Sequence, residues 1–274
     1  MNKEFQEVKD FQMAFGHPTA DAPTPMANER AMKRYAWMLE EINEFLDAVK
    51  SGDIVEQADA MIDTMYFALG TLVELGVKPD ELFEIVQNAN MSKLWEDGKP
   101  HYNEMGKVIK PEGWENPHPK LAGAIEQMKT SLEVDPTKKD YSIDYQYEEV
   151  KKFHTAFGHP TSDTPVSMTN ERASKRYAWM LEEINEFLDA VKSGDIVEQA
   201  DAMIDTIYFA LGTLVEMGVH PGVLFDIVQN ANMSKLWKDG KPHYNEMGKV
   251  VKPEGWENPH PKLARAIDKM KMYE

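Results

Sequence analysis

The amino-acid sequence predicts an all-α protein made of two tandem helical bundles that pack as an internal pseudo-dimer. Three observations support this prediction. The 274-residue chain repeats itself without gaps, so that Phe15-Gly16-His17-Pro18 returns as Phe157-Gly158-His159-Pro160. Within each copy, apolar residues recur every three to four positions, as on one face of a helix. No convincing strand alternation interrupts the pattern, apart from a small hairpin expected around Gly106.

The repetition sets the expected domain boundaries. Residues 31–128 and 173–270 differ at only 12 of 98 positions. We therefore expect two similar domains, at 1–129 and 145–274. The polar segment 130–144, which contains an Asp-Pro step, is expected to be the linker between them.

The first two helices of a copy are predicted from their amphipathic spacing. Residues 3–15 carry phenylalanine and valine side chains at spacings of three and four. A proline-rich loop follows at 17–25. Residues 28–50 carry a single apolar stripe, and Gly52 is a suitable stop because glycine readily adopts the left-handed conformation that ends a helix.

The remaining elements follow in the same way. Asp53 is a plausible N-cap for a third, strongly apolar helix at 54–76. A proline then opens a fourth helix, expected at 79–95. A long loop rich in glycine, proline and lysine is expected at 96–118, and a short helix at 119–129 closes the unit.

Composition excludes several classes of function. The formal net charge is −17, which argues against binding nucleic acid or an anionic membrane. The chain has no cysteine, so it can form no disulfide and no thiolate metal site. We find neither a signal peptide nor a run of about 18 apolar residues, and we expect a cytoplasmic protein.

Acidic residues in the second and third expected helices are the most informative feature. A helix turns about 100° per residue, so the acidic side chains of each helix share a sector beside its apolar stripe. The connection at Ser51-Gly52 is so short that the two helices must run antiparallel, which pairs Glu44 with Asp59 and Glu40 with Asp63. The full set is Glu40, Glu41 and Glu44 on one helix and Glu56, Asp59 and Asp63 on the other.

Such a cluster is costly unless a cation fills it, and an all-oxygen site suits Mg²⁺ or Mn²⁺. Three alternatives remain open. The cluster could be a solvated acidic face. Glu56 could bond back to Asp53 in a capping box. Asp63 and Glu40, which lie further round their helices, could each be solvated.

Downstream of the acidic cluster lies a basic one. Asn90 and Lys93 stand at the end of the fourth expected helix, and the long loop adds Lys107 and Lys110. Lysines on glycine-containing loops suit polyphosphate oxygens. Alternatively, both loop lysines are ordinary solvated charges and Trp114 pins the loop to the bundle. The acidic and basic clusters together indicate a metal–polyphosphate substrate.

Histidine positions argue against one other metal site. A di-iron carboxylate bundle needs Glu-x-x-His on its helices. Seven of the eight histidines are next to a proline, at loops or helix edges. His154 alone lies inside an expected helix, and its counterpart is Gln12. A redox di-iron site is therefore not expected.

These motifs resemble the all-α NTP pyrophosphatase superfamily, which includes MazG-like enzymes, dimeric dUTPases and phosphoribosyl-ATP pyrophosphohydrolase. The acidic signature has the superfamily's EExxE…ExxD form, and the resemblance extends through Asn90-Met91-Ser92-Lys93 to Lys110-Pro111-Glu112-Gly113-Trp114. It covers most of each repeat. Because family members are usually dimers or tetramers of single-copy chains, the tandem chain departs from the pattern. Each of its two sites could borrow residues from the other copy.

The resemblance implies a role for each matching residue. The metal, Mg²⁺ or Mn²⁺, would be held by Glu41, Glu44, Glu56, Asp59, Glu183, Glu186, Glu198 and Asp201. The water-activating carboxylates would be Glu40, Glu41, Glu182 and Glu183. The substrate-binding residues would be Asn90, Lys93, Lys110, Asn232, Lys235 and Lys252. The roles of Asp63 and Asp205 stay open.

The resemblance further implies a metal-dependent hydrolase that converts a (d)NTP and water into a (d)NMP and pyrophosphate. Candidate substrates are dUTP or a non-canonical nucleotide. Two alternatives are an enzyme like phosphoribosyl-ATP pyrophosphohydrolase and a non-catalytic helical module that binds a basic partner. The expected partner is a nucleoside triphosphate, and further homo-oligomerisation is left open.

Overall fold

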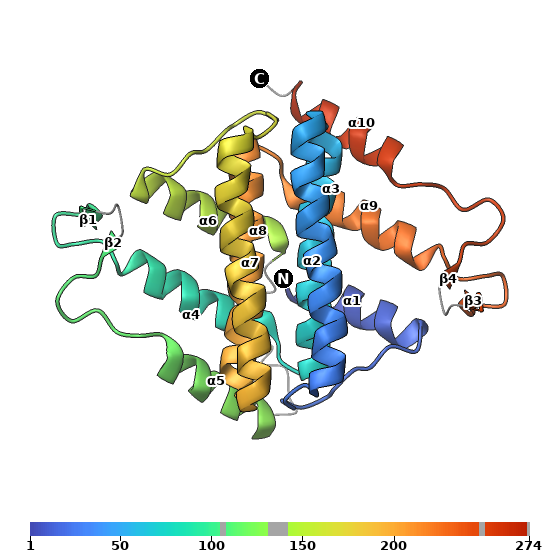
Figure 1. Ribbon diagram of the computed structural model, residues 1–274, viewed down its shortest axis with the longest axis horizontal. Coiled ribbons are helices and arrows are strands. Elements are labelled where there is room, and N and C mark those ends of the chain that lie inside the picture. The colour runs from blue at the N-terminus through green and yellow to red at the C-terminus, as the bar shows by residue number, and fades with distance from the viewer. Residues whose placement is uncertain (105–107, 131–141, 247–249, 273–274) are drawn as a thin grey trace.

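Each copy is built on a long helical hairpin that local sequence signals define. In the computed structural model, which describes residues 1–104, 108–130, 142–246 and 250–272, the first hairpin consists of α2 and α3 (Figure 1). Gly52 ends α2 with a left-handed φ of 72°. Asp53 then caps α3, because its side chain accepts hydrogen bonds from the amides of Val55 at 2.9 Å and Glu56 at 3.2 Å. The two-residue connection at 52–53 therefore reverses the chain, as predicted.

The elements of the two copies correspond one to one. In the first copy they are α1 (Asn2–Ala14), α2 (Asn28–Ser51), α3 (Ile54–Leu75), α4 (Pro79–Met91), β1 (His101–Tyr102), β2 (Val108–Ile109) and α5 (His118–Thr130). In the second copy they are α6 (Ile143–Phe157), α7 (Asn170–Ser193), α8 (Ile196–Met217), α9 (Pro221–Met233), β3 (His243–Tyr244), β4 (Val250–Val251) and α10 (His260–Met270). Each pair of strands is antiparallel. The tip of the hairpin predicted at Gly106 lies outside the described residues.

The predicted end of the fourth helix is wrong. α4 ends at Met91 and not at residue 95. Beyond it the chain tightens into three-residue turns, in which the amide of Lys93 bonds to the carbonyl of Asn90 at 3.2 Å and the amide of Leu94 to that of Met91 at 3.1 Å. The Ser92 hydroxyl also donates to the carbonyl of Ala89 at 2.8 Å, a local bond that competes with the helical pattern.

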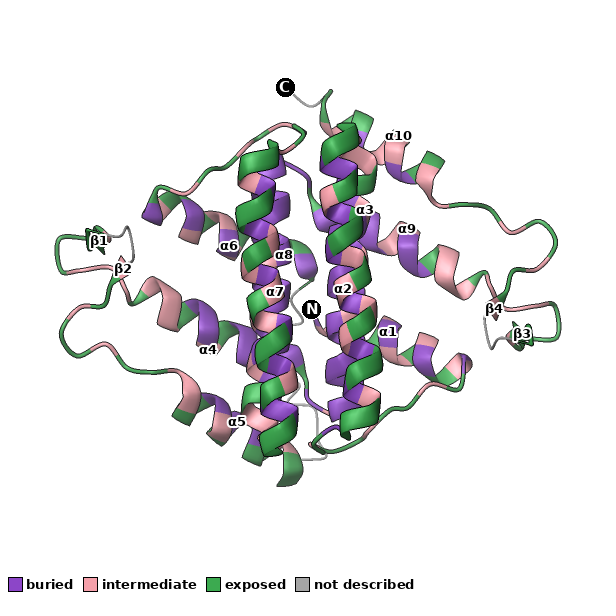
Figure 2. Cartoon of the chain, viewed as in Figure 1, coloured by how far each residue is buried: buried purple, intermediate pink, exposed green. Residues whose placement is uncertain are grey.

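The four long helices α2, α3, α7 and α8 form the centre of the molecule, where α2 packs against α7 and α3 against α8 (Figure 1). α3 and α8 are buried over most of their length, whereas α2 and α7 keep one exposed face (Figure 2). A single hydrophobic core runs through both copies. The prediction of an all-α fold with two repeats packed as an internal pseudo-dimer is confirmed.

The outer helices exchange between the copies. α4 and α5 of the first copy pack against α8 of the second, and α9 and α10 of the second pack against α3 of the first (Figure 1). Hydrogen bonds tie this exchange at the core: the Tyr66 hydroxyl donates to Gln229 at 2.6 Å, and the Tyr208 hydroxyl donates to Gln87 at 2.7 Å. The domain boundaries 1–129, 130–144 and 145–274 stay a prediction, and most of the linker lies outside the described residues.

Among the described segments, no single helix is both long and apolar enough to cross a membrane. Two sharply bent pairs, α3 with α4 and α8 with α9, satisfy that test by length and composition alone.

A buried ion-pair network joins α2 to α3 beside the central helices. Glu74 on α3 has only 3% of its side chain exposed. Its carboxylate accepts a hydrogen bond from Nε of Arg30 at 2.7 Å and forms an ion pair with Arg34, whose Nε lies 2.9 Å away. Trp37 covers both guanidinium groups, whose carbons lie 5.1 and 5.6 Å from the ring centroid. The second copy has the equivalent network around Glu216.

We expect Glu74→Ala to lower the free energy of unfolding by about 3–5 kcal/mol, because it leaves the buried Arg34 guanidinium without its anion. Urea denaturation followed by circular dichroism measures the change. Glu29→Ala is the matched control, because it removes an exposed partner of Lys33 and should cost less than about 1 kcal/mol. Equal losses in the two variants would contradict the role of the network.

Candidate active site

The α2–α3 hairpin brings the predicted acidic residues into one charge cluster. Burial raises the pKa of Glu41 to about 9, and the charge of Asp63 on the facing helix makes the next largest contribution. Burial likewise raises the pKa of Asp63 to about 8, followed by repulsion from Asp59. Without a cation, the buried part of the cluster therefore holds protons at neutral pH.

The outer part of the cluster is more exposed but is coupled to the inner part. Burial, followed by repulsion from Glu56, raises the pKa of Asp59 to about 6. Burial and the charge of Glu40 raise the pKa of Glu44. One oxygen of Asp59, Oδ1, is buried and has no hydrogen-bond partner among the described residues, and the same holds for Asp201. Unpaired, crowded carboxylate oxygens are a suitable donor set for a hard divalent cation.

The pairing inferred from helix geometry needs one adjustment. Glu40 is exposed and is not among the main charges that shift the pKa of Asp63. The charge of Asp63 makes the largest charge contribution to the raised pKa of Glu41, and Glu44 is the α2 residue whose charge raises the pKa of Asp63. The constant-sum rule treats the helices as strictly parallel rods, whereas packed helices cross at an angle, so residues paired by the sum need not face each other.

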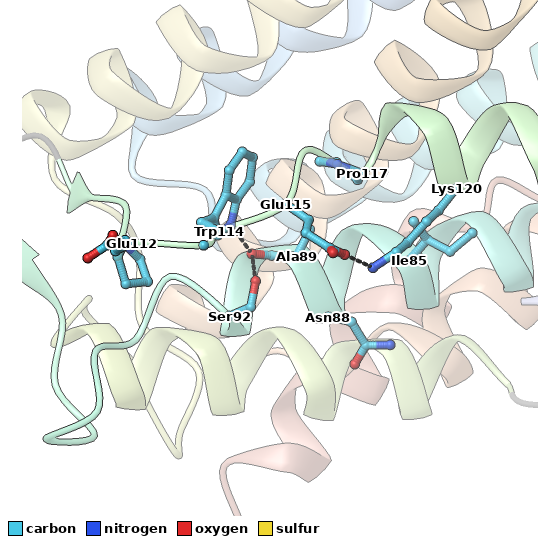
Figure 3. A pocket seen from close by; sticks show the side chains of 11 residues that line it. Ile85, Asn88, Ala89, Ser92, Glu112, Trp114, Glu115, Pro117 and Lys120 are labelled. Carbon is cyan, nitrogen blue, oxygen red and sulfur yellow. Dashed lines mark hydrogen bonds and ion pairs between the residues drawn. The ribbon is translucent and has the colours of Figure 1, made fainter.

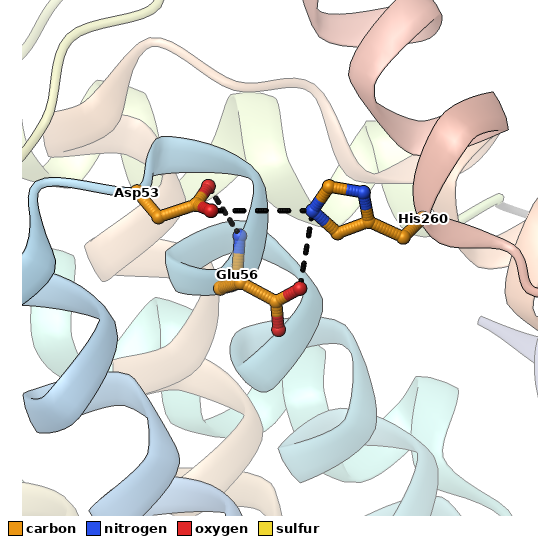
Figure 4. Close-up of side chains that lie close together, drawn as sticks. All are labelled: Asp53, Glu56 and His260. Carbon is orange, nitrogen blue, oxygen red and sulfur yellow. Dashed lines mark hydrogen bonds and ion pairs between the residues drawn. The ribbon is translucent and has the colours of Figure 1, made fainter.

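A histidine that the sequence reasoning set aside contacts this cluster from the other copy. His260, the first residue of α10, lies with Nε2 3.1 Å from Glu56 Oε1 and 4.0 Å from Asp53 Oδ2 (Figure 4). His118 at the start of α5 makes the equivalent contact with Glu198 at 3.0 Å. The sequence signal for both histidines is a His-Pro step that opens a helix. This step carries no information about which copy the histidine faces.

The capping alternative for Glu56 is also decided. Asp53 caps α3, but its own amide donates to the carbonyl of Ala48 at 3.0 Å. The amide that a capping box would offer to the Glu56 carboxylate is therefore already used. Glu56 is about half exposed and is directed toward His260 (Figure 4).

Basic and amide groups reach the acidic cluster from the opposite copy. A cavity of about 320 Å³ is lined by Glu41 and Asp63 of the first copy together with Asn232 and Lys235 of α9 and its C-terminal turn. Lys235 Nζ donates to Asn232 Oδ1 at 2.7 Å, and its charge offsets part of the rise in the pKa of Asp63 that burial and Asp59 cause. The second cavity, of about 280 Å³, is lined in the same way by Glu183, Asp205, Asn90 and Lys93.

Lys110 of the long loop lies near Lys93, which lines the second cavity. Lys110 Nζ lies 3.8 Å from the centroid of the Trp114 ring, and Lys93 Nζ lies 6.0 Å from it. The Trp114 indole donates to the carbonyl of Ala89 at 3.0 Å, so this tryptophan does pin the loop to α4 (Figure 3). Burial lowers the pKa of Lys93, and the nearby charge of Lys110 adds to this effect. Lys107 lies outside the described residues.

Each candidate site is therefore a composite of the two copies. Site 1 combines the acidic residues of α2 and α3 with Asn232, Lys235 and Lys252 from the second copy. Site 2 combines the acidic residues of α7 and α8 with Asn90, Lys93 and Lys110 from the first. The sequence analysis grouped each set by copy and left the exchange open.

Comparison with known proteins identifies the family of the chain. A family model described as phosphoribosyl-ATP pyrophosphohydrolase matches the chain twice, at residues 8–90 and 150–232. The chain belongs to this family. Both matches cover the helical hairpin of their copy and extend to Asn90 or Asn232, so the family region occurs once in each copy. Membership of this family supports a nucleotide pyrophosphohydrolase activity.

Among solved structures, the chain is similar to a protein from Exiguobacterium sp. 255-15 that is described as a putative NTP pyrophosphohydrolase. The two are 34% identical, the match covers 49% of this chain and 100% of that one, and the TM-score is 0.29. A comparison with curated proteins finds no match.

The raised pKa values predict how stability depends on pH in the absence of metal. A carboxyl whose pKa is higher in the folded state stabilises the fold below its unfolded pKa, and this stabilisation is lost as pH rises through the folded pKa. With folded values of about 6, 8 and 9 for Asp59, Asp63 and Glu41, the melting temperature in chelator should fall as pH rises from about 5 to 9.

Differential scanning fluorimetry in buffers of constant ionic strength measures this dependence. A divalent cation should reduce the fall, because it stabilises the ionised carboxylates. Glu41→Gln with Glu183→Gln should flatten the profile in chelator. A metal-free melting temperature that rises over the same interval would contradict the assigned shifts.

Proposed function

We propose that the protein is a metal-dependent nucleoside triphosphate pyrophosphohydrolase with two composite sites. The observation that carries the proposal is the meeting, in one cavity, of buried carboxylates from one copy with an Asn–Lys pair from the other. A phosphate chain bridged to a cation needs anionic ligands on one side and cationic donors on the other. Site 1 supplies both.

In site 1 the cation, Mg²⁺ or Mn²⁺, would be held by Glu41, Glu44, Glu56 and Asp59. In site 2 the matching ligands would be Glu183, Glu186, Glu198 and Asp201. When bound, such an ion neutralises phosphate charge and lowers the pKa of a coordinated water. The unpaired buried oxygens of Asp59 and Asp201 support this assignment.

The remaining groups act on water and on the leaving group. Glu40 or Glu41, with Glu182 or Glu183 as counterparts, orients the attacking water and accepts its proton. The water oxygen forms a bond to the α-phosphorus, and the bond from that phosphorus to the α–β bridging oxygen breaks. The products are a nucleoside monophosphate and pyrophosphate. Lys235 and Lys252 stabilise the charge that develops on the departing pyrophosphate in site 1.

A second candidate is hydrolysis of phosphoribosyl-ATP, which is favoured by the description of the matching family. It is the same reaction at the same α–β linkage and differs only in what the adenine carries. A panel of nucleotides with Mg²⁺ or Mn²⁺, including phosphoribosyl-ATP, dUTP and modified triphosphates, separates the candidates by the rate of pyrophosphate release.

We expect Glu41→Gln combined with Glu183→Gln to lower kcat on the best substrate by at least about 10²-fold, because both sites lose a carboxylate that binds metal and activates water. Steady-state pyrophosphate release at saturating Mg²⁺ measures the effect. Full activity in this variant would rule out the mechanism.

Two double variants test whether the sites are composites. Glu41→Gln with Lys235→Ala damages only site 1, so the activity of site 2 should remain. Glu41→Gln with Lys93→Ala damages both sites, so nearly all activity should be lost. Both variants carry one acidic and one basic change, which makes each the control for the other. The reverse ranking would show that each copy builds its own site.

A further inference from the structure

The two cavities differ in one lining side chain. Equivalent positions carry the same residue throughout both linings, including the aromatic wall of Phe11, Trp37 and Tyr66, with one exception. The first cavity contains Gln12, where the second contains His154. Both side chains are buried, with 3% of each residue exposed. A difference at this depth changes what the cavity offers to a ligand.

Gln12 leaves its carbonyl oxygen unpaired. Its Nε2 donates to the carbonyl of Pro18 at 3.1 Å and to Glu74 Oε1 at 3.2 Å. Both partners can only accept, so the amide orientation is fixed and the oxygen points elsewhere. That Oε1 is buried and has no hydrogen-bond partner among the described residues.

Arg34 leaves a donor unpaired beside it. Arg34 Nε lies 2.9 Å from the same carboxylate oxygen, Glu74 Oε1, that receives Gln12, so the two side chains are neighbours. Arg34 is 4% exposed, and its Nη2 has no hydrogen-bond partner in the described part of the chain. The first cavity thus contains one unpaired acceptor and one unpaired donor on buried side chains that line it.

His154 closes this pair in the second cavity. Its Nδ1 lies 2.9 Å from the carbonyl of Pro160, which can only accept, so Nδ1 carries the proton. Burial and the nearby Arg176 lower the pKa of His154 to about 3, so the ring is neutral and Nε2 is an acceptor. Arg176 Nη2 donates to it at 3.4 Å. The donor that is unpaired in the first cavity is therefore used internally in the second.

We propose that the two cavities bind the nucleoside part of the substrate with different base selectivity. In the first cavity, the Gln12 acceptor and the Arg34 donor are unpaired and can bind the base. In the second, His154 already uses the equivalent donor. The proposal rests on the proposed function only for the assignment of these cavities to nucleotides. An unpaired buried group is costly, so a ligand that pairs it gains more than one that cannot. A guanidinium favours a carbonyl oxygen, and the Gln12 oxygen requires an N–H.

The first cavity therefore selects a base that has a carbonyl next to a ring N–H, as in uracil, thymine, hypoxanthine or guanine. Because Glu41 lines the same cavity, such a base lies next to one of the proposed metal ligands. The second cavity retains the aromatic wall but lacks the polar readout, so it tolerates bases without this edge.

Exchange of the two residues tests the proposal on the full chain. Isothermal titration with deoxyuridine monophosphate in Mg²⁺ should resolve two sites in the wild type, with dissociation constants at least about tenfold apart. Gln12→His should leave two sites of the weaker class, and His154→Gln should give two of the tighter class. The N3-methyl analogue of the same nucleotide, which lacks the donor, should bind all three proteins at two equivalent weak sites.

Met32→Ser is the matched control, because it copies another difference between the repeats at an exposed position outside both cavities. Both exchanged residues already occupy the equivalent pocket of this chain, and circular dichroism checks that each variant is folded. Equivalent sites in the wild type, or affinities that do not move with the exchange, would overturn the proposal. The proposal would also be overturned if the N3-methyl analogue bound as tightly as deoxyuridine monophosphate. Absence of pyrophosphate release alone would overturn the proposed function and leave the binding result intact.

Discussion

The arrangement of the two copies around each candidate site depends on charge compensation for carboxylates that the α2–α3 hairpin holds together. Helical spacing and a short antiparallel connection force these acidic groups to one level, where burial and mutual repulsion raise their pKa values. No positive charge of the same hairpin is among the main contributions to the pKa values of Glu41, Asp59 and Asp63. The compensating groups are Lys235 and His260, which the exchanged helices of the second copy deliver. The exchange of outer helices therefore also determines the composition of the candidate site.

The same exchange explains why both copies contribute residues to each candidate site. A hairpin alone would present an acidic face to water, with no donor for a phosphate chain. The buried hydrogen bond from Tyr66 to Gln229 fixes α9 against α3, and the Asn232–Lys235 pair follows directly from that contact. Packing of the shared core and assembly of the site are thus coupled, because the helix that carries the donors also covers the core.

Tandem duplication in one chain has a consequence that a homodimer does not share. In a symmetric dimer, any change to the pocket appears in both sites. Here Gln12 and His154 occupy equivalent positions but belong to separate codons of one chain, so one site can change while the other keeps its chemistry. Gln12 donates to Glu74 in the first copy, whereas His154 is paired with Arg176 in the second, so this single difference changes which donors of the buried network are paired.

The sequence by itself determined the helices, the duplication, the acidic hairpin and the candidate residues, because helical periodicity, capping signals and the Gly52–Asp53 turn act over a few residues. It failed at the end of α4, where a serine side chain and tight turns compete with the helix. It also could not identify His118 and His260 as neighbours of the acidic clusters. Only the tertiary structure decided which copy supplies each lysine and histidine. Contacts between residues more than a hundred positions apart depend on how the helices pack, and two nearly identical copies give local sequence no means of telling one partner from the other.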